Sequence, residues 1–94
     1  YYIIMVNSKD FLQAANIVKK LSKTPTNIEL GLLYGYYKQA TCGDNTSSKP
    51  FMLDFKGVAK WEAWTKCKGM TAYDSEVAYI TLVNKLIKKY SLKK

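Results

Sequence analysis

The sequence contains no histidine, no arginine and only two cysteines among its 94 residues. Without histidine, a Ser–His or Cys–His catalytic pair and a histidine-containing metal site are excluded. Cys42 and Cys67 form no CxxC pair, so a zinc site is not expected either. A secreted domain of this size commonly carries more cysteines, paired as disulfides. We therefore expect two free thiols in buried or half-buried positions, and a reducing, cytoplasmic compartment.

Long apolar runs are also absent. The longest, YYIIMV at residues 1–6, falls far short of the ~20 residues that a membrane span needs, and it lacks the features of a signal peptide. A chain of this length makes one domain. We interpret residues 1–8 as an N-terminal flank, residues 9–92 as the domain and residues 93–94 as a basic tail. The flank is expected to be an addition to the domain, an extra turn packed on it or the end of a longer protein.

The formal net charge is +8, and every cationic side chain is a lysine. A basic protein attracts anions such as nucleic acids, acidic lipids and phosphorylated small molecules. Arginine dominates base recognition and bidentate phosphate contacts in DNA complexes. Its absence counts against a DNA reader, whereas lysines still suit point-charge contacts with phosphate. Many of these lysines are expected only to keep a helical surface soluble.

Apolar spacing predicts four helices and no strand. The first covers about Lys9–Leu21, and the polar pair Asn7-Ser8 can cap it. The second begins with Thr26–Glu29, a T-x-x-E capping box in which two side chains satisfy free backbone donors. It ends at Gly43, because glycine adopts the left-handed conformation of a helix end at little cost.

A loop of about a dozen residues, 44–55, follows. Its apolar triplet Phe51–Leu53 is expected to pack on the core. The third helix covers about Gly57–Lys66, and its Trp61 and Trp64, three residues apart, are expected to be core residues. The length of the loop would allow the helices on either side of it to run parallel.

The fourth helix begins at Thr71, and Asp74, three residues later, completes a second capping signature. Lysines gather at its C-terminal end, where the helix dipole favours cations. The four segments together predict an all-α fold, a small four-helix bundle. The buried face of this last helix is expected to comprise Val77, Ile80, Val83, Leu86, Ile87 and Tyr90.

A tyrosine–lysine cluster is the clearest candidate for a binding site. Tyr34, Tyr37 and Lys38 are three or four residues apart and therefore share one side of the second helix. A phenol can stack on a base and an ammonium group can neutralise a phosphate, so the cluster suits an adenine nucleotide. Tyrosines at the edge of a core, with buried rings and solvated hydroxyls, are the competing structural explanation. Lys60 and Tyr79 are weaker candidates for the same site.

Signals for catalysis are poor. The seven carboxylates are scattered along the chain, and most are expected in helix caps or on solvated faces. No P-loop and no GxGxxG motif occurs. We therefore expect a binding protein and no enzyme.

Four segments together resemble the acyl-CoA-binding protein family. The pattern Y-x-x-Y-K-Q-A-T-x-G occupies residues 34–43, and K-x-x-A-K-W-x-A-W occupies residues 56–64. The pattern A-A-x-x-V-K-x-L lies at residues 14–21, and A-Y-I lies at residues 78–80. The resemblance extends from about Phe11 to Tyr90 without an evident gap.

The resemblance implies a bundle of up-down-down-up topology that binds medium- and long-chain acyl-CoA thioesters non-covalently. Such a protein acts as an intracellular acyl-CoA carrier and pool former, and it uses no metal and no cofactor. It is expected to be a cytoplasmic monomer with transient contacts to membranes or to acyl-CoA enzymes. The alternative hypothesis is a lysine-rich helical nucleic-acid-binding module.

The resemblance also implies which residues meet the two ends of the ligand. Tyr34, Lys38 and Lys60 would hold the ribose 3′-phosphate, the Tyr37 ring would contact the adenine, and Lys19 would lie near the phosphates or the thioester. The complete set implied for the CoA head group is Lys19, Tyr34, Gly35, Tyr36, Tyr37, Lys38, Lys60 and Tyr79. The set implied for the acyl chain is Phe11, Ala15, Leu30, Gly31, Lys56 and Ala59.

Two positions depart from the family pattern. Gly31 stands where a bulky apolar residue is usual, which bears on the preferred chain length. Thr24 stands where a lysine is common, which removes one charge from the mouth of the expected pocket.

Overall fold

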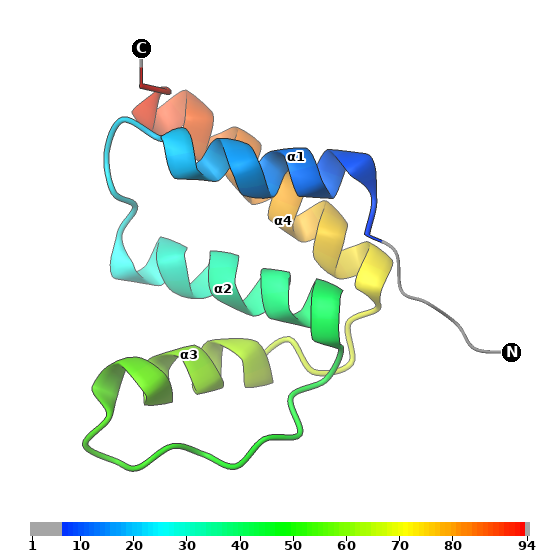
Figure 1. Cartoon of the computed structure of the whole chain (residues 1–94), viewed down its shortest axis with the longest axis vertical. Helices are drawn as coiled ribbons and strands as arrows, with labels where there is room; N and C mark the ends of the chain where they lie inside the picture. The colour runs from blue at the N-terminus through cyan, green and yellow to red at the C-terminus, as the bar shows by residue number, and fades with distance from the viewer. Residues whose placement is uncertain (1–6, 94) are drawn as a thin grey trace, which may run out of the picture.

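The computed structural model describes residues 7–93, and in these residues it forms four α-helices. They are α1 (Lys9–Ile17), α2 (Asn27–Cys42), α3 (Phe55–Thr65) and α4 (Ala72–Tyr90), with a short 3₁₀ turn, η1 (Val18–Lys20), after α1. The helices run in the order up, down, down, up, because α2 and α3 are parallel and both oppose α1 and α4 (Figure 1). The predicted all-α class and topology are confirmed.

The predicted caps are all formed. The Oγ of Ser8 accepts a hydrogen bond from the Phe11 N–H at 3.2 Å, and Thr71 caps α4 through the Asp74 N–H at 3.0 Å. In the capping box of α2, the Thr26 hydroxyl accepts from the Glu29 N–H, and the Glu29 carboxylate accepts from the Thr26 N–H. These local pairs fix where each helix begins.

Two helices differ in their bounds from the prediction. α1 ends at Ile17 because the chain tightens into η1 before the predicted end at Leu21. α3 begins at Phe55, two residues early, because Asp54 caps it by accepting the Gly57 N–H at 3.0 Å.

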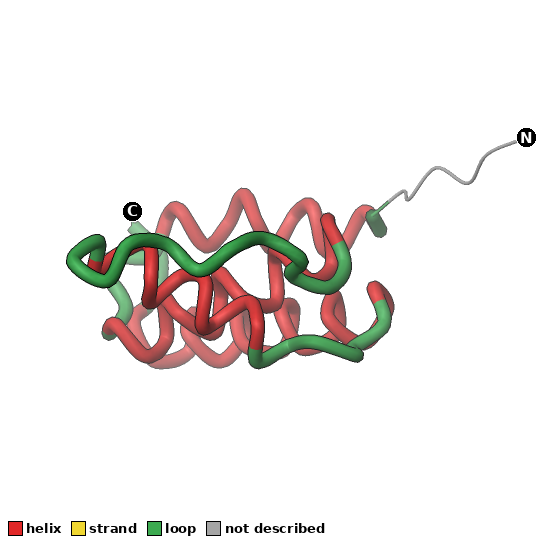
Figure 2. Tube along the Cα trace, turned by 90° about the horizontal axis from the view of Figure 1, so that it is seen from below, coloured by secondary structure: helices red, strands yellow, loops and turns green. Residues whose placement is uncertain are grey.

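The loop between α2 and α3 returns along the edge of the molecule, so that α3 begins near the level where α2 begins (Figures 1 and 2). Two expectations for this region are wrong. Trp61 and Trp64 are only half-buried, and their indole N–H groups hold the loop by donating to the Ser47 and Gly43 carbonyls at 2.9 and 2.8 Å. The triplet Phe51–Leu53 is exposed instead of packing on the core.

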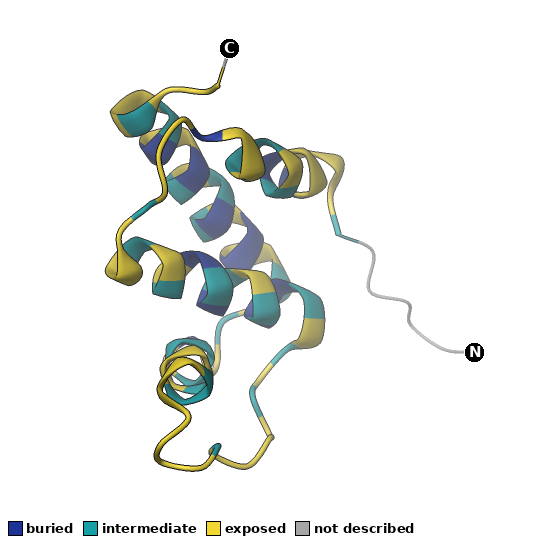
Figure 3. Cartoon of the chain, turned by 60° about the vertical axis from the view of Figure 1, so that its left-hand side comes forward, coloured by how far each residue is buried: buried dark blue, intermediate teal, exposed yellow. Residues whose placement is uncertain are grey.

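The core lies where α4 crosses α1 and α2, and it is visible as the dark blue segments of Figure 3. α2 packs against α4 on one side and α3 on the other, and α1 packs against α4. The layer is thin, with principal extents of 42 × 39 × 16 Å. The buried core residues are Phe11, Ala14, Leu21, Leu33, Ala40, Tyr79, Val83 and Leu86.

The predicted inner face of α4 is right in part. Val83 and Leu86 are buried, and Ile80, Ile87 and Tyr90 pack partly against the core. Val77, however, is exposed. The first turns of α4 instead turn the polar Ser75 and Glu76 inward.

Both chain ends that the structure describes are held by hydrogen bonds. The Asn7 amide donates to the Ala40 carbonyl at 3.0 Å and to the Glu76 carboxylate at 2.7 Å. Glu76 is buried, unlike most of the carboxylates, which were expected in caps or on solvated faces. At the other end, backbone bonds from Ser22 to Ser91 and from Lys93 to Lys20 form a single antiparallel bridge.

The two thiols are free, as predicted, but only Cys67 is buried; Cys42 is exposed. No helix within residues 7–93 combines the length and the hydropathy that a bilayer crossing requires. The opening stretch YYIIMV, interpreted as a flank, lies outside the described residues.

Candidate functional site

The predicted tyrosine–lysine cluster lies where α2 faces α3. The Lys60 ammonium of α3 stands over the Tyr34 ring of α2, 5.6 Å from its centroid. In the reciprocal direction, the Lys38 ammonium of α2 stands 4.8 Å from the centre of the Trp64 ring of α3. Two cations, one from each helix, are thus held against an aromatic ring of the facing helix.

Small residues bring these two helices together. Gly35 is buried, and a Cβ atom at this position would lie 2.5 Å from the carbonyl oxygen of Ala63. No side chain fits there, so the backbones of α2 and α3 can approach closely only with glycine at this position. This approach sets the spacing between Lys38 and Lys60.

The cationic side chains of the cluster are available to an anion. Within residues 7–93, the ion pairs closer than 4.0 Å are Lys49–Glu62 and Lys89–Glu29. Lys19, Lys38 and Lys60 therefore have no carboxylate partner in the part of the chain that the structure describes. Uncompensated ammonium groups beside aromatic rings favour a ligand that is both anionic and flat.

Three aromatic rings, one each from α1, α2 and α4, form a stack that includes Tyr37 of the cluster. The Phe11 ring lies 5.5 Å from the Tyr37 ring and 5.0 Å from the Tyr79 ring, and the two tyrosine rings are 5.9 Å apart. Phe11 and Tyr79 are buried, while Tyr37 is partly exposed. Such ring pairs add stability beyond their buried area, so the stack holds the Tyr37 ring in place at the surface.

Tyr79, predicted as a weaker candidate for the site, lies in the core, and only 4% of it is exposed. Burial, with a smaller contribution from the neighbouring Tyr37, raises the pKa of Tyr79 to about 12. Its hydroxyl therefore keeps its proton at neutral pH and can act as a hydrogen-bond donor.

A cavity of about 300 Å³ opens beside the stack between η1 and α2. Its wall is mostly apolar, with the Lys19 ammonium as the one charged group. It brings together five of the predicted residues from three parts of the chain. The lining residues are Val18, Lys19, Pro25, Leu30, Leu33, Tyr34, Tyr37 and Tyr79.

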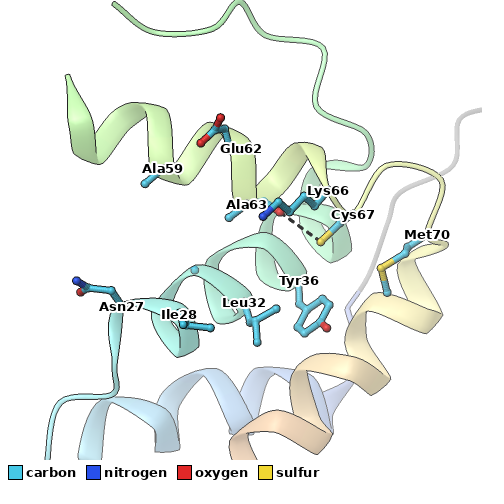
Figure 4. Close-up of a pocket in the computed structure, with 11 residues that line it drawn as sticks. Asn27, Ile28, Leu32, Tyr36, Ala59, Glu62, Ala63, Lys66, Cys67 and Met70 are labelled. Atoms are coloured by element: carbon cyan, nitrogen blue, oxygen red, sulfur yellow. Dashed lines mark hydrogen bonds between the residues drawn. The ribbon is translucent and has the colours of Figure 1, made fainter. Parts of the chain in front are cut away.

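A second cavity, of about 450 Å³, lies between α2 and α3 (Figure 4). The predicted residues Gly31, Tyr36 and Ala59 line it. Tyr36 is two residues from Tyr34, about 200° around the helix, so it lies on another side of α2 from Tyr34 and Lys38. The remaining lining residues are Asn27, Ile28, Leu32, Glu62, Ala63, Lys66, Cys67 and Met70.

The other predicted residues lie around these two cavities. Phe11 is fully buried under Tyr37, and Ala15 is half-buried against the core. Lys56 is exposed in the first turn of α3. Sequence reasoning missed the part played by Trp64, because its contact with Lys38 crosses from one helix to another and leaves no spacing signal.

These features define a class: small all-α bundles in which lysines and tyrosines of facing helices gather beside an apolar cavity. The family model described as acyl CoA binding protein matches residues 8–83. The chain belongs to the acyl-CoA-binding protein family.

Relatives and solved structures agree with this assignment. Acyl-CoA-binding protein homolog 1 of Caenorhabditis elegans is 51% identical over 80 residues, which cover 85% of this chain and 93% of that protein. The acyl-CoA-binding protein homolog of Drosophila melanogaster is 48% identical over 84 residues, which cover 89% of this chain and 98% of that protein.

Among solved structures, the yeast acyl coenzyme A binding protein matches with a TM-score of 0.72 and 46% identity, covering 90% of this chain and 99% of that one. Acyl-CoA-binding protein 2 of Oryza sativa matches with a TM-score of 0.82 and 36% identity, and the match covers 86% of this chain and 90% of that one.

Proposed function

We propose that this protein binds medium- and long-chain acyl-CoA thioesters non-covalently and serves as their carrier and pool former. The observation that carries the proposal is that α2 and α3 each hold a lysine over an aromatic ring of the other helix, Lys60 over Tyr34 and Lys38 over Trp64, while Tyr34 also lines an apolar cavity. An acyl-CoA has the matching chemistry, since it joins several phosphate charges and an adenine to a hydrocarbon chain. Family membership supports the same ligand.

The head group would be held by charge and by stacking. Lys38, Lys60 and the Tyr34 hydroxyl would bind the ribose 3′-phosphate, and the partly exposed Tyr37 ring would receive the adenine. Lys19, at the rim of the cavity beside the stack, would meet the phosphates or the thioester. Two of the remaining members of the proposed set would act indirectly: Gly35 allows the close approach of α3, and Tyr79 packs against the Tyr37 ring. Tyr36 lies on the far side of α2, in the cavity between α2 and α3.

The acyl chain would contribute most of the affinity. Burial of each methylene group is worth about 0.8 kcal/mol, so a long chain outweighs the cost of ordering it. Leu30, in the cavity beside the stack, and Gly31 and Ala59, in the cavity between α2 and α3, offer apolar surface. Ala15 and the stem of Lys56 would flank the chain, and Phe11 would support it from within the core.

We propose no catalysis, a monomeric state and a cytoplasmic location for this carrier, with transient contacts to membranes or acyl-CoA enzymes during exchange. The nucleic-acid hypothesis gains no support from the family match. The two hypotheses differ in salt dependence. Nucleic-acid binding weakens steeply as salt rises, because counterions are released. Acyl-CoA binding should retain much of its affinity, because the chain contributes an apolar term.

The proposal is tested by calorimetric titration with palmitoyl-CoA, with free CoA and palmitate as comparisons. Lys38→Ala and Lys60→Ala are each expected to weaken binding about tenfold or more, the loss of one charge-assisted contact. Lys88→Ala is the matched control, because Lys88 is exposed on α4 and lines neither cavity. If the two variants bind like the parent, the head-group assignment is wrong; if the parent gives no heat, the proposed function is wrong.

A further inference from the structure

The loop before α3 ends in an exposed turn with an unusual composition. The Asp54 N–H donates to the Phe51 carbonyl at 2.8 Å, which places Met52 and Leu53 at the apex of the turn. Turns of this kind usually carry glycine, proline, asparagine, aspartate or serine. Here Phe51, Met52, Leu53 and Phe55 are 70, 74, 64 and 74% exposed. We call these four residues the apolar tip.

The surrounding hydrogen bonds hold the apolar tip in its exposed position. On one side, Asp54 caps α3 through the Gly57 N–H, so the tip is joined directly to a helix. On the other side, the Asn45 amide donates to the Thr65 hydroxyl at 3.0 Å, and Trp61 donates to the Ser47 carbonyl. The segment is therefore fixed at both ends, at the edge of the molecule away from α1 and α4 (Figure 3).

The charges beside the tip are mainly positive. Lys49, Lys56 and Lys60 lie within five residues of it along the chain, and the one acidic residue in that range, Asp54, is engaged in the helix cap. Lys49 has an exposed carboxylate partner, Glu62, at 3.8 Å. Within residues 7–93, Lys56 and Lys60 have no such partner.

We infer that the apolar tip docks the protein on an anionic lipid bilayer. Four exposed apolar side chains within five residues suit the boundary between headgroups and acyl chains, and flanking lysines suit anionic headgroups. A protein partner with an apolar groove would need no positive rim. The charge of the rim therefore favours a lipid surface.

Docking in this way would bring the ligand groove close to the bilayer. Lys60 follows Asp54 by six residues, a rise of about 9 Å along α3. An amphiphile in the facing leaflet would thus lie about 10 Å from Lys60, one of the lysines proposed to hold its phosphates. This last step rests on the proposed function; the docking itself does not.

The test is co-sedimentation of the full chain with phosphatidylserine-containing vesicles and with pure phosphatidylcholine vesicles. The parent is expected to bind the anionic vesicles more strongly. The double variant Met52→Ser/Leu53→Ser is expected to lose at least about tenfold in that binding, because two large apolar side chains no longer insert. The matched control is Tyr73→Ser, since Tyr73 is also 74% exposed but lies at the start of α4. It should bind as the parent does.

Two results overturn the inference: a parent that binds neither kind of vesicle, or a double variant that binds like the parent. Palmitoyl-CoA titration and far-ultraviolet circular dichroism of the double variant separate the possible failures. Unchanged ligand binding and helicity, together with lost vesicle binding, support the tip as the docking element. Absent palmitoyl-CoA binding in the parent would reject the proposed function and leave the vesicle result standing.

Discussion

At the scale of single residues, Glu29 joins two distant parts of the chain. Its carboxylate caps α2 and also accepts hydrogen bonds from the Tyr90 hydroxyl at 2.7 Å and the Lys89 ammonium at 2.9 Å. These bonds, Tyr90 first and Lys89 next, with the Thr26 N–H after them, lower the pKa of Glu29 to about 2. One side chain thus fastens the start of α2 to the end of α4.

This lowered pKa predicts a pH dependence of stability. A carboxylate whose folded-state pKa is depressed contributes stability that is present above its unfolded pKa of 4.5 and lost as the pH falls toward about 2. Glu29→Gln is expected to lose less stability across this window than the parent does. Urea unfolding at a series of pH values measures the difference.

Tyr90→Phe removes the hydrogen bond that lowers the pKa of Glu29 most and should show a smaller change in the same direction. Parallel pH profiles for the parent and Glu29→Gln would contradict the assignment.

The residue scale also shows what sequence can and cannot predict. The bond between Thr26 and Glu29 was predicted, because both residues lie in one turn of one helix. The bonds from Glu29 to Lys89 and Tyr90, and from Asn7 to Glu76, were not, because they exist only after the helices have packed. The pairing of Lys38 with Trp64 belongs to the same group.

At the scale of elements, the contact of α2 with α3 depends on small residues. Gly31 and Gly35 are one turn apart, yet their surroundings differ. A Cβ at Gly31 would meet only the Cβ of Ala63, at an ordinary 3.9 Å, whereas a Cβ at Gly35 would collide with backbone. Only Gly35 is therefore required for the close approach of the two helices.

These two glycines form a matched pair of substitutions. Gly35→Ala is expected to destabilise the fold by about 1–3 kcal/mol, because the backbone of α3 must move. Gly31→Ala is expected to be neutral or to stabilise by up to about 1 kcal/mol, because alanine is the better helix former. Urea unfolding of both variants measures the two effects. Equal effects would show that the helices are not held together at Gly35.

Helices were predictable because apolar spacing and caps are local signals. The loop before α3 was not. Apolar residues are buried on average, so Phe51–Leu53 were assigned to the core, but the hydrogen bonds around Asp54 turn them outward. The two tryptophans were assigned to the core for the same reason, although each indole donor reaches a loop carbonyl instead.

At the scale of the whole molecule, the four helices form a layer only 16 Å thick. α2 is the central element, since it packs on both α4 and α3. α3 has no buried residue among its eleven, and it is attached mainly through α2. The proposed ligand would add a second connection, because Lys38 and Lys60 come from these two helices.

This arrangement predicts uneven hydrogen exchange. Amides of α3 are expected to exchange faster than those of α2 and α4 in the free protein, because weakly attached elements open most easily. Palmitoyl-CoA should slow the exchange of α3 more than that of α4. Hydrogen exchange monitored by mass spectrometry, with and without the ligand, provides the measurement. Equal slowing in both helices would argue against a ligand bound between α2 and α3.

The two cysteines differ in a way that has a practical use. Cys42 is exposed at the end of α2, whereas Cys67 is buried and desolvation raises the pKa of its thiol. A maleimide dye reacts with the thiolate and needs access to it, so it attaches to Cys42 and leaves Cys67 unmodified. These 94 residues therefore accept a single fluorophore without engineering, at the end of the helix that forms one wall of the proposed binding groove.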